Sequence, residues 1–164
     1  EQEILNELAE ALSEDRKNYV LPFRFVRPNG ERTSHYLILV SKHVIGYTIM
    51  KDIMYTHSSE HNDGVASFSY VSVGPNKQLS LLSMFDRPVD NLADELCVTF
   101  RGQKLTVKEI FDAHHVNTPF VLRNYKEALR RLEAENRIAC DPSERRISKG
   151  VKTMGETVVI TFPK

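Results

Sequence analysis

The sequence predicts an α+β fold in which an N-terminal helix, a β-hairpin and a further helix precede a C-terminal winged helix-turn-helix. Two observations lead to this prediction. Apolar residues recur at helical spacing in some segments and cluster in short β-prone runs in others. After residue 105, two helices with clear start signals are separated by a short turn and followed by two β-prone stretches, which is the order of elements in a winged helix.

The first elements are a helix and a hairpin. Residues 1–17 are rich in helix formers and place apolar side chains three and four positions apart, as an amphipathic helix does. Residues 19–26 and 33–41 are rich in aromatic and β-branched residues, which favours strands. Between them, Pro28-Asn29-Gly30 is a strong turn signal, so we expect a β-hairpin.

The next segments are expected to cover and extend this hairpin. The run Tyr36–Val40 is apolar at every position, which predicts a strand covered on both faces. A helical stripe over Val44–Tyr55 would supply one cover. Residues 57–67 are polar and predict a loop, and Phe68–Val73 predicts a short strand. We therefore expect residues 1–87 to form an α/β platform.

The remaining residues, 88–164, are expected to form the winged helix-turn-helix domain. A helix begins near Pro88, since proline suits the first helical turn. Thr106 caps a second helix that runs to His115, and Thr118-Pro119 caps a third that runs to Asn136. Residues 137–140 and 157–162 then predict the two strands of the wing.

The third helix, residues 119–136, is the expected recognition helix. Its apolar residues Leu122, Tyr125, Leu129 and Leu132 share the side that faces the other helices. Arg123 and Asn124 are then candidates for reading bases, since Arg bonds guanine and Asn bonds adenine in the major groove. The full set of candidate DNA-binding residues, most of them expected on phosphates, is Arg123, Asn124, Lys126, Arg130, Arg131, Arg145, Arg146, Lys149 and Lys152.

The charge distribution agrees with a polyanionic partner for the second part of the chain. Residues 1–100 hold 9 Lys and Arg against 14 Asp and Glu, whereas residues 101–164 hold 13 against 8. Opposing this, Glu127, Glu133 and Glu135 lie on the recognition helix, where carboxylates near phosphate weaken binding. The sequence therefore favours DNA as the ligand but leaves a docking role for the same module open.

Other classes of function find little support. No apolar run is long enough to cross a bilayer and the first residues do not resemble a secretory signal, so a cytoplasmic protein is expected. Cys97 and Cys140 have no metal-binding or disulfide spacing. His57, Glu60, His61 and Asp63 are the densest group of metal-binding residue types, but solvation of a polar loop explains them better. No catalytic or phosphate-binding motif is present, so neither a catalytic residue nor a cofactor is assigned.

Several segments resemble the bacterial three-Cys-motif partner proteins, also called TcmP. The likeness is carried by residues 34–43, by Gly46-Tyr47 with residues 50–54, and by residues 118–120, 124–126 and 153–163. The resemblance implies a region similar to a class I methyltransferase followed by a helix-turn-helix. It also implies that the platform of residues 1–87, with its hairpin at residues 19–41, is similar to the end of a methyltransferase-like sheet. The chain lacks the glycine-rich segment that would bind S-adenosylmethionine, so methyl transfer is not assigned to these residues.

The sequence therefore predicts a DNA-binding winged-helix module. Two alternatives stay open. The module can be a protein-docking unit for a three-Cys-motif partner, or the chain can be the C-terminal piece of a methyltransferase-like enzyme that modifies nucleic acid. If the chain is such a piece, we expect one face or edge of Tyr36–Val40 to be exposed or covered by a second copy, because a two-stranded hairpin alone is marginal in water. We therefore also expect a homodimer or a domain swap.

Overall fold

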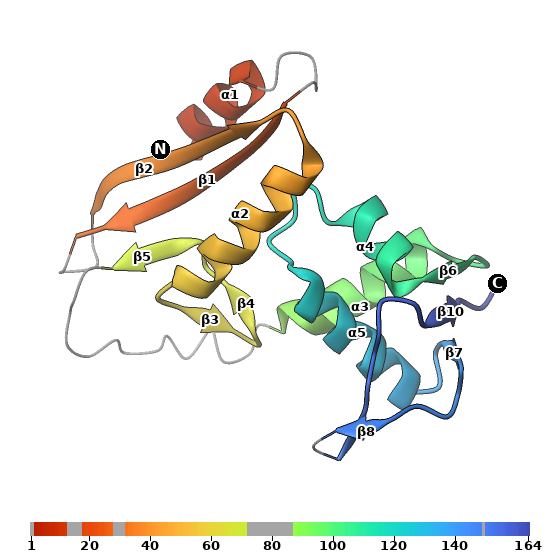
Figure 1. Ribbon diagram of the computed structural model, residues 1–164. Coiled ribbons are helices and arrows are strands. Elements are labelled where there is room, and N and C mark those ends of the chain that lie inside the picture. Colours follow the sequence, from red (N-terminus) through yellow and green to blue (C-terminus); the bar gives the residue numbers. More distant parts are fainter. Residues whose placement is uncertain (1, 13–17, 28–31, 72–86, 149) are drawn as a thin grey trace. The chain divides into compact units, whose positions relative to one another are not determined.

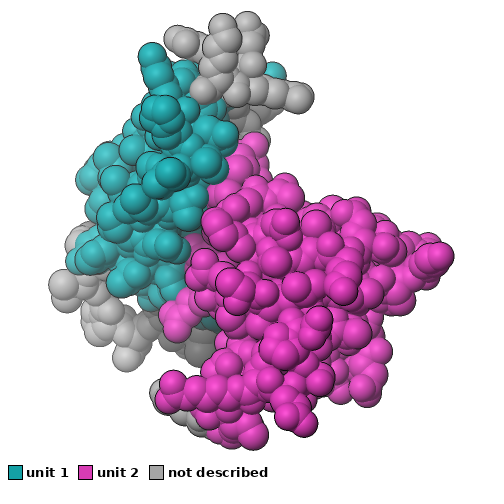
Figure 2. Space-filling view, turned by 45° about the vertical axis from the view of Figure 1, so that its right-hand side comes forward, with its two compact units in different colours: residues 1–85 teal, residues 86–164 magenta. Residues whose placement is uncertain are grey.

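The computed structural model describes residues 2–12, 18–27, 32–71, 87–148 and 150–164. The chain divides into two compact units, unit 1 with residues 1–85 and unit 2 with residues 86–164 (Figure 2). Within the described ranges, no helix has the length and apolar character that crossing a membrane requires.

Unit 1 is built on a twisted hairpin, as the sequence predicts (Figure 1). Strand β1 (Tyr19–Val26) pairs antiparallel with β2 (Thr33–Ser41) and parallel with β5 (Ser69–Val71), which gives the strand order β2-β1-β5. Helix α1 (Gln2–Leu12) contacts β1. The predicted turn at Pro28-Asn29-Gly30 and residues 13–17 of the predicted first helix lie outside the described residues.

Helix α2 (Val44–His57) supplies the core of unit 1. Its Tyr47 and Met54 pack with Leu21 and Phe23 of β1, and all four side chains are buried. These strand residues alternate along β1, so the face of the sheet that bears them is the face that α2 covers. The expected helical cover over residues 44–55 is therefore present, two residues longer than predicted.

The edge of the sheet differs from the expectation. Strand β2 ends the strand order, and its Leu37 and Val40 are exposed. The apolar run Tyr36–Val40 predicted a strand covered on both faces, and that interpretation is wrong for these residues. An apolar run reports strand propensity, but it does not determine which neighbours cover the strand.

The segment that the sequence predicts as a loop contains a small hairpin, β3 (His61–Asn62) and β4 (Val65–Ala66). Asp63 and Gly64 form its tight turn with φ angles of 47° and 75°. This left-handed conformation suits Asp-Gly, which is a preferred pair for two-residue hairpin turns.

Unit 2 has the element order of a winged helix. Three helices and a first short strand are followed by two strands of the sheet that flank a small hairpin. In order these elements are α3 (Pro88–Thr99), β6 (Lys104–Thr106), α4 (Val107–His114), α5 (Leu122–Ala134), β7 (Ala139–Asp141), β8 (Ile147–Ser148), β9 (Val151–Lys152) and β10 (Val159–Thr161).

The sheet of unit 2 joins the first and last strands of this order. Strand β10 lies between β6 and β7 and runs antiparallel to both, while β8 and β9 pair with each other beyond the sheet. Helices α3 and α4 both contact α5, whose Tyr125, Leu129 and Leu132 are fully buried. The predicted α+β fold with a C-terminal winged helix-turn-helix is therefore confirmed.

The ends of α4 and α5 are fixed by local hydrogen bonds. Thr106 and Glu109 form a capping box: the Glu109 amide donates to Thr106 Oγ1 at 3.2 Å, and the Thr106 amide donates to Glu109 Oε2 at 2.7 Å. The second bond lowers the pKa of Glu109, because it stabilises the carboxylate. Past the end of α5, Asn136 adopts a φ of 57°, and the Arg137 amide donates to the Leu132 carbonyl at 2.9 Å.

Candidate nucleic-acid interface

The outer face of α5 carries three cations that share one side of the helix. Arg123 is exposed, and Lys126 and Arg130 follow three and seven positions later, half-buried. The Lys126 ammonium lies 3.3 Å from Glu156 Oε1, and the Arg130 guanidinium pairs with Glu127 on the same helix. This face of α5 is therefore basic but partly neutralised by its own neighbours.

Glu127 lies between the cations of this face. It pairs with Arg130 and also lies 3.4 Å from Arg131 Nε, so one carboxylate serves two guanidinium groups. A carboxylate at the middle of a DNA-binding face repels phosphate, but pairing with two arginines reduces that repulsion. The net charge that residues 123–131 present to a phosphate therefore depends on how strongly Glu127 is paired with the two arginines.

Arg131 has a structural contact as well. Its Nη1 lies 2.6 Å from Asp90 Oδ1, which ties α5 to the first turn of α3. A guanidinium held between Asp90 and Glu127 is poorly placed to reach phosphate, so the structure does not support Arg131 as a DNA-binding residue.

Asn124 has a different position from the one expected. It is only 2% exposed, and its Oδ1 accepts a hydrogen bond from the Val121 amide at 3.0 Å. The side chain therefore caps α5 from inside its first turn. The helix begins at Leu122 rather than at residue 119, and this start places Asn124 on the inner side. A buried cap is not available to an adenine edge, so Asn124 is not kept as a base-reading residue.

The wing begins with an arginine that is part of its framework. The side chain of Arg145 is 4% exposed and pairs with Glu133 of α5. Its Nε donates to the Thr153 carbonyl at 2.9 Å and its Nη1 donates to the Pro142 carbonyl at 2.8 Å. These bonds tie both arms of the wing to α5, so Arg145 is withdrawn from the residues expected to hold phosphate.

The tip of the wing is exposed and has a mixed character. Arg146 and Lys152 are exposed, as are the apolar side chains of Ile147 and Val151. Ile147 pairs with Lys152 across the hairpin, and Gly150 turns it with a φ of 79°. The predicted phosphate-binding residue Lys149 lies outside the described residues.

A buried polar junction that the sequence did not predict joins the helices of unit 2. His114 Nδ1 lies 2.7 Å from the Tyr125 hydroxyl oxygen, and His114 Nε2 lies 3.3 Å from Glu95 Oε1. The next residue, His115, is 1% exposed, and its Nδ1 lies 2.8 Å from the Phe111 carbonyl. His114 therefore links α3, α4 and α5, whereas His115 bonds within α4. No local pattern indicates the role of His114, because its partners are distant in sequence.

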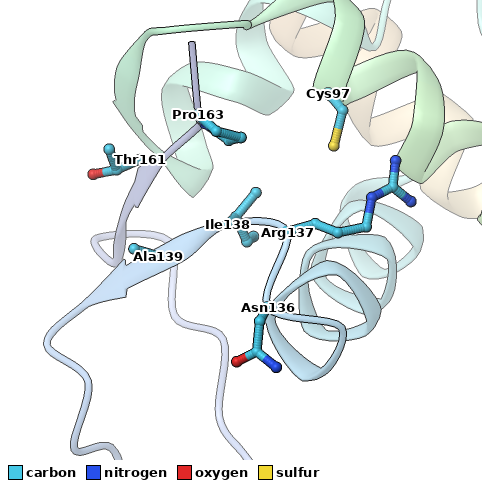
Figure 3. A pocket seen from close by; sticks show the side chains of 7 residues that line it. All are labelled: Cys97, Asn136, Arg137, Ile138, Ala139, Thr161 and Pro163. Carbon is cyan, nitrogen blue, oxygen red and sulfur yellow. The ribbon is translucent and has the colours of Figure 1, made fainter.

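An open cavity of about 510 Å³ lies beside α3, between the chain that follows α5 and the end of β10. Figure 3 shows the side chains around it, from Cys97, Asn136, Arg137, Ile138, Ala139, Thr161 and Pro163. Burial raises the pKa of the Cys97 thiol, which disfavours a reactive thiolate. The Arg137 guanidinium pairs with Asp94 at 2.7 Å. The lining is mainly apolar and offers no acid, base or nucleophile pair for catalysis.

The polar group of unit 1 that resembled metal ligands is not assembled. His61 Nε2 lies 3.1 Å from the Tyr55 carbonyl, and its ring packs on the Tyr55 ring. Among the described residues, no group of three or more His, Cys, Asp or Glu side chains is placed to hold an ion.

Comparison with known families supports the class of fold. Residues 74–145 match the family model described as GMT-like wHTH domain, a winged helix-turn-helix. The match covers α3, β6, α4, α5 and β7 and ends before the small hairpin of β8 and β9. No curated protein and no solved structure matches the chain. The chain thus contains a winged helix-turn-helix related to that model, and the model does not itself name the three-Cys-motif partner proteins.

Proposed function

We propose that unit 2 binds duplex DNA, with the outer face of α5 in the major groove and the wing against the backbone. One observation carries the proposal: the winged-helix order leaves the exposed side of α5 basic, and the wing continues with exposed cations. In winged-helix and related folds, this third helix is the element that enters the groove. The matched family model supports the same class of function.

The contacts follow from which side chains remain accessible. Arg123 lies in the first turn of α5 and is exposed, so it is the candidate for a guanine edge. Lys126 and Arg130 are candidates for phosphate, in exchange for their present partners Glu156 and Glu127. Arg146 and Lys152 are the candidates for backbone contact on the wing.

The test is duplex binding by single arginine variants. Arg123→Ala and Arg146→Ala are each expected to weaken binding to a random-sequence duplex about threefold to tenfold at low salt, because each removes a positive charge from the surface that faces the DNA. Arg101→Ala is the matched control, since Arg101 is exposed in the turn between α3 and β6. Equal affinity for all three variants and the unsubstituted chain contradicts the proposed face.

A second candidate function is protein docking through the wing. Ile147 and Val151 are exposed on the small hairpin, where the register places them on opposite faces, and exposed apolar side chains of this kind suit protein contacts as well as DNA grooves. A three-Cys-motif protein would be the partner if the family resemblance holds. The same resemblance supports the proposal that unit 1 corresponds to the end of a methyltransferase-like sheet.

The two candidates differ in which wing residues matter. Docking predicts that Ile147→Ser removes partner binding while Arg123→Ala leaves it intact. DNA binding predicts that Arg123→Ala has the larger effect on duplex affinity. A chain that shifts no duplex in a gel at low salt leaves docking as the better interpretation of the module.

A further inference from the structure

Helix α2 has a second apolar face that the core of unit 1 does not use. Ile45, Ile49 and Ile53 are 69%, 57% and 47% exposed. They recur every four residues, so they form one row that runs slightly obliquely along the helix. The opposite side of α2 contains the buried residues Tyr47 and Met54, which already anchor the helix to the sheet.

Such a stripe is a feature of a contact surface. Single exposed apolar residues are ordinary, but three aligned isoleucines on one helix form a contiguous patch. The remaining exposed positions of this face are small or polar and border the stripe: Gly46, Asp52, Thr56 and His57. The patch is therefore narrow, apolar along its centre and polar at its margins, as helix-to-helix contacts are.

We infer that the α2 stripe pairs with the α2 stripe of a second copy of this chain, with the two helices antiparallel. In a two-fold interface, a residue i that contacts residue j of the second copy requires that residue j also contacts residue i of that copy. The stripe satisfies this requirement about Ile49: Ile49 meets Ile49 of the second copy, and Ile45 meets its Ile53.

The charges around the stripe favour the antiparallel direction. The N-terminal end of α2 follows Lys42, has no acidic residue in its first turn and receives no side-chain cap from His43. In the antiparallel pair, Asp52 lies opposite Gly46 of the second copy, in that uncapped first turn and about one turn from Lys42. A carboxylate there is stabilised by the helix dipole and by the lysine, whereas a parallel pair would align like charges.

The area of the patch determines how tightly the two copies are expected to bind. Three isoleucines in each copy bury less than the roughly 1,200 Å² in total at which stable interfaces begin, so the flanking residues must also contribute and the complex is expected to be weak and transient. We therefore expect a concentration-dependent dimer with a dissociation constant on the order of 10 μM.

Sedimentation equilibrium of the full chain without DNA, from about one-tenth to ten times that constant, tests the pairing. The unsubstituted chain is expected to shift from monomer to dimer, and Ile49→Glu to stay monomeric, because it places two carboxylates against each other. Val98→Glu is the control, since Val98 is an exposed apolar residue of α3 in unit 2. If circular dichroism shows that Ile49→Glu is unfolded, Ile53→Ser replaces it. A strict monomer, or a dimer that persists in the stripe variant, overturns the inference.

The direction of the pair is tested by charge exchange. Lys42→Glu and Asp52→Lys are each expected to weaken the dimer several-fold, and the double variant is expected to restore it. Single variants that dimerise as well as the unsubstituted chain, or a double variant as weak as the singles, overturn the antiparallel arrangement. These measurements contain no DNA, so their outcome is independent of the proposed DNA-binding function.

Discussion

Arg145 and Arg146 are neighbours in the sequence, yet the structure gives them different environments. Arg145 is buried among Glu133 and the carbonyls of Pro142 and Thr153, whereas Arg146 is exposed on the wing. Arg123 and Asn124 show the same contrast on α5, one exposed and the other a buried cap. At the residue scale, function is therefore assigned by partner and burial, because residue type and position in a basic run do not distinguish these pairs.

The arginine pair gives a prediction about stability. Arg145→Ala is expected to lower the free energy of unfolding by about 2 kcal/mol or more, because it leaves Glu133 without its partner in a partly buried site. Arg146→Ala is expected to change it by less than about 0.5 kcal/mol, as exposed substitutions usually do. Urea denaturation followed by far-ultraviolet circular dichroism measures both variants. Equal losses in the two would refute the framework role of Arg145.

Lys51 gives a prediction about pH. It is 1% exposed against the core of unit 1, with its Nζ 5.6 Å from the centre of the Tyr47 ring. Burial lowers the pKa of Lys51 to about 7, and the nearby Asp52 partly opposes this shift. Between about pH 7 and 10.5 the unfolded chain then binds the proton that the folded chain has lost. Stability contributed by this site is therefore expected to rise with pH across that window and to be lowest below pH 7.

Lys51→Met tests this dependence. The variant is expected to be more stable than the unsubstituted chain at pH 6, with a difference that shrinks as the pH approaches 9, because the neutral amine no longer opposes burial. Tyrosine fluorescence during urea denaturation is a suitable signal, since five of the six tyrosines lie in unit 1. A difference in stability that is constant from pH 6 to 9 would show that Lys51 does not titrate in this range.

At the scale of elements, α5 and the wing form one framework. Arg131 ties α5 to α3 through Asp90, and Arg145 ties the wing to α5 through Glu133. Arg131 and Arg145, which the sequence predicted as DNA-binding residues, therefore hold in place the helix and the wing that carry the exposed cations. Preorganised side chains lose less conformational entropy on binding, so such a framework favours the affinity of the exposed cations.

A substitution of Glu127 tests whether the basic face of α5 binds DNA. Glu127→Gln is expected to raise affinity for duplex DNA about threefold or more, because it removes a carboxylate and releases Arg130 to phosphate. Glu135→Gln, at the C-terminal end of α5, is the control and is expected to have a smaller effect. Fluorescence anisotropy with a labelled duplex measures both. An unchanged or lower affinity for Glu127→Gln would place the DNA on another face.

At the scale of the whole molecule, local patterns in the sequence predict most elements but few of their partners. The hairpin strands and α2 follow from strand propensity and helical periodicity, and the start of α4 follows from Thr106 as a helix-capping residue. Strand β6 is only three residues long, which is too short to produce a pattern, and the parallel pairing of β5 with β1 joins residues 45 positions apart. Such long-range pairings are set by the assembled fold.

The candidate site was predicted less well than the fold, for a related reason. The basic character of the region is visible in composition, and the exposure of Arg123 follows from the phase of the apolar residues on α5. The inward position of Asn124 depends on where α5 begins, and the burial of Arg145 depends on Glu133, which is twelve residues away in the sequence. Each of these contacts required the tertiary structure.

The central claim is that the outer face of α5 and the wing bind duplex DNA through Arg123 and Arg146. The most direct measurement is the salt dependence of duplex affinity for the unsubstituted chain and for the Arg123→Ala, Arg146→Ala double variant. The claim predicts that the logarithm of affinity falls linearly with the logarithm of salt concentration. It also predicts that the double variant binds more weakly and has a slope smaller by about one, because Arg146 is the phosphate contact of the two. An affinity independent of salt, or the same slope for both proteins, would contradict it.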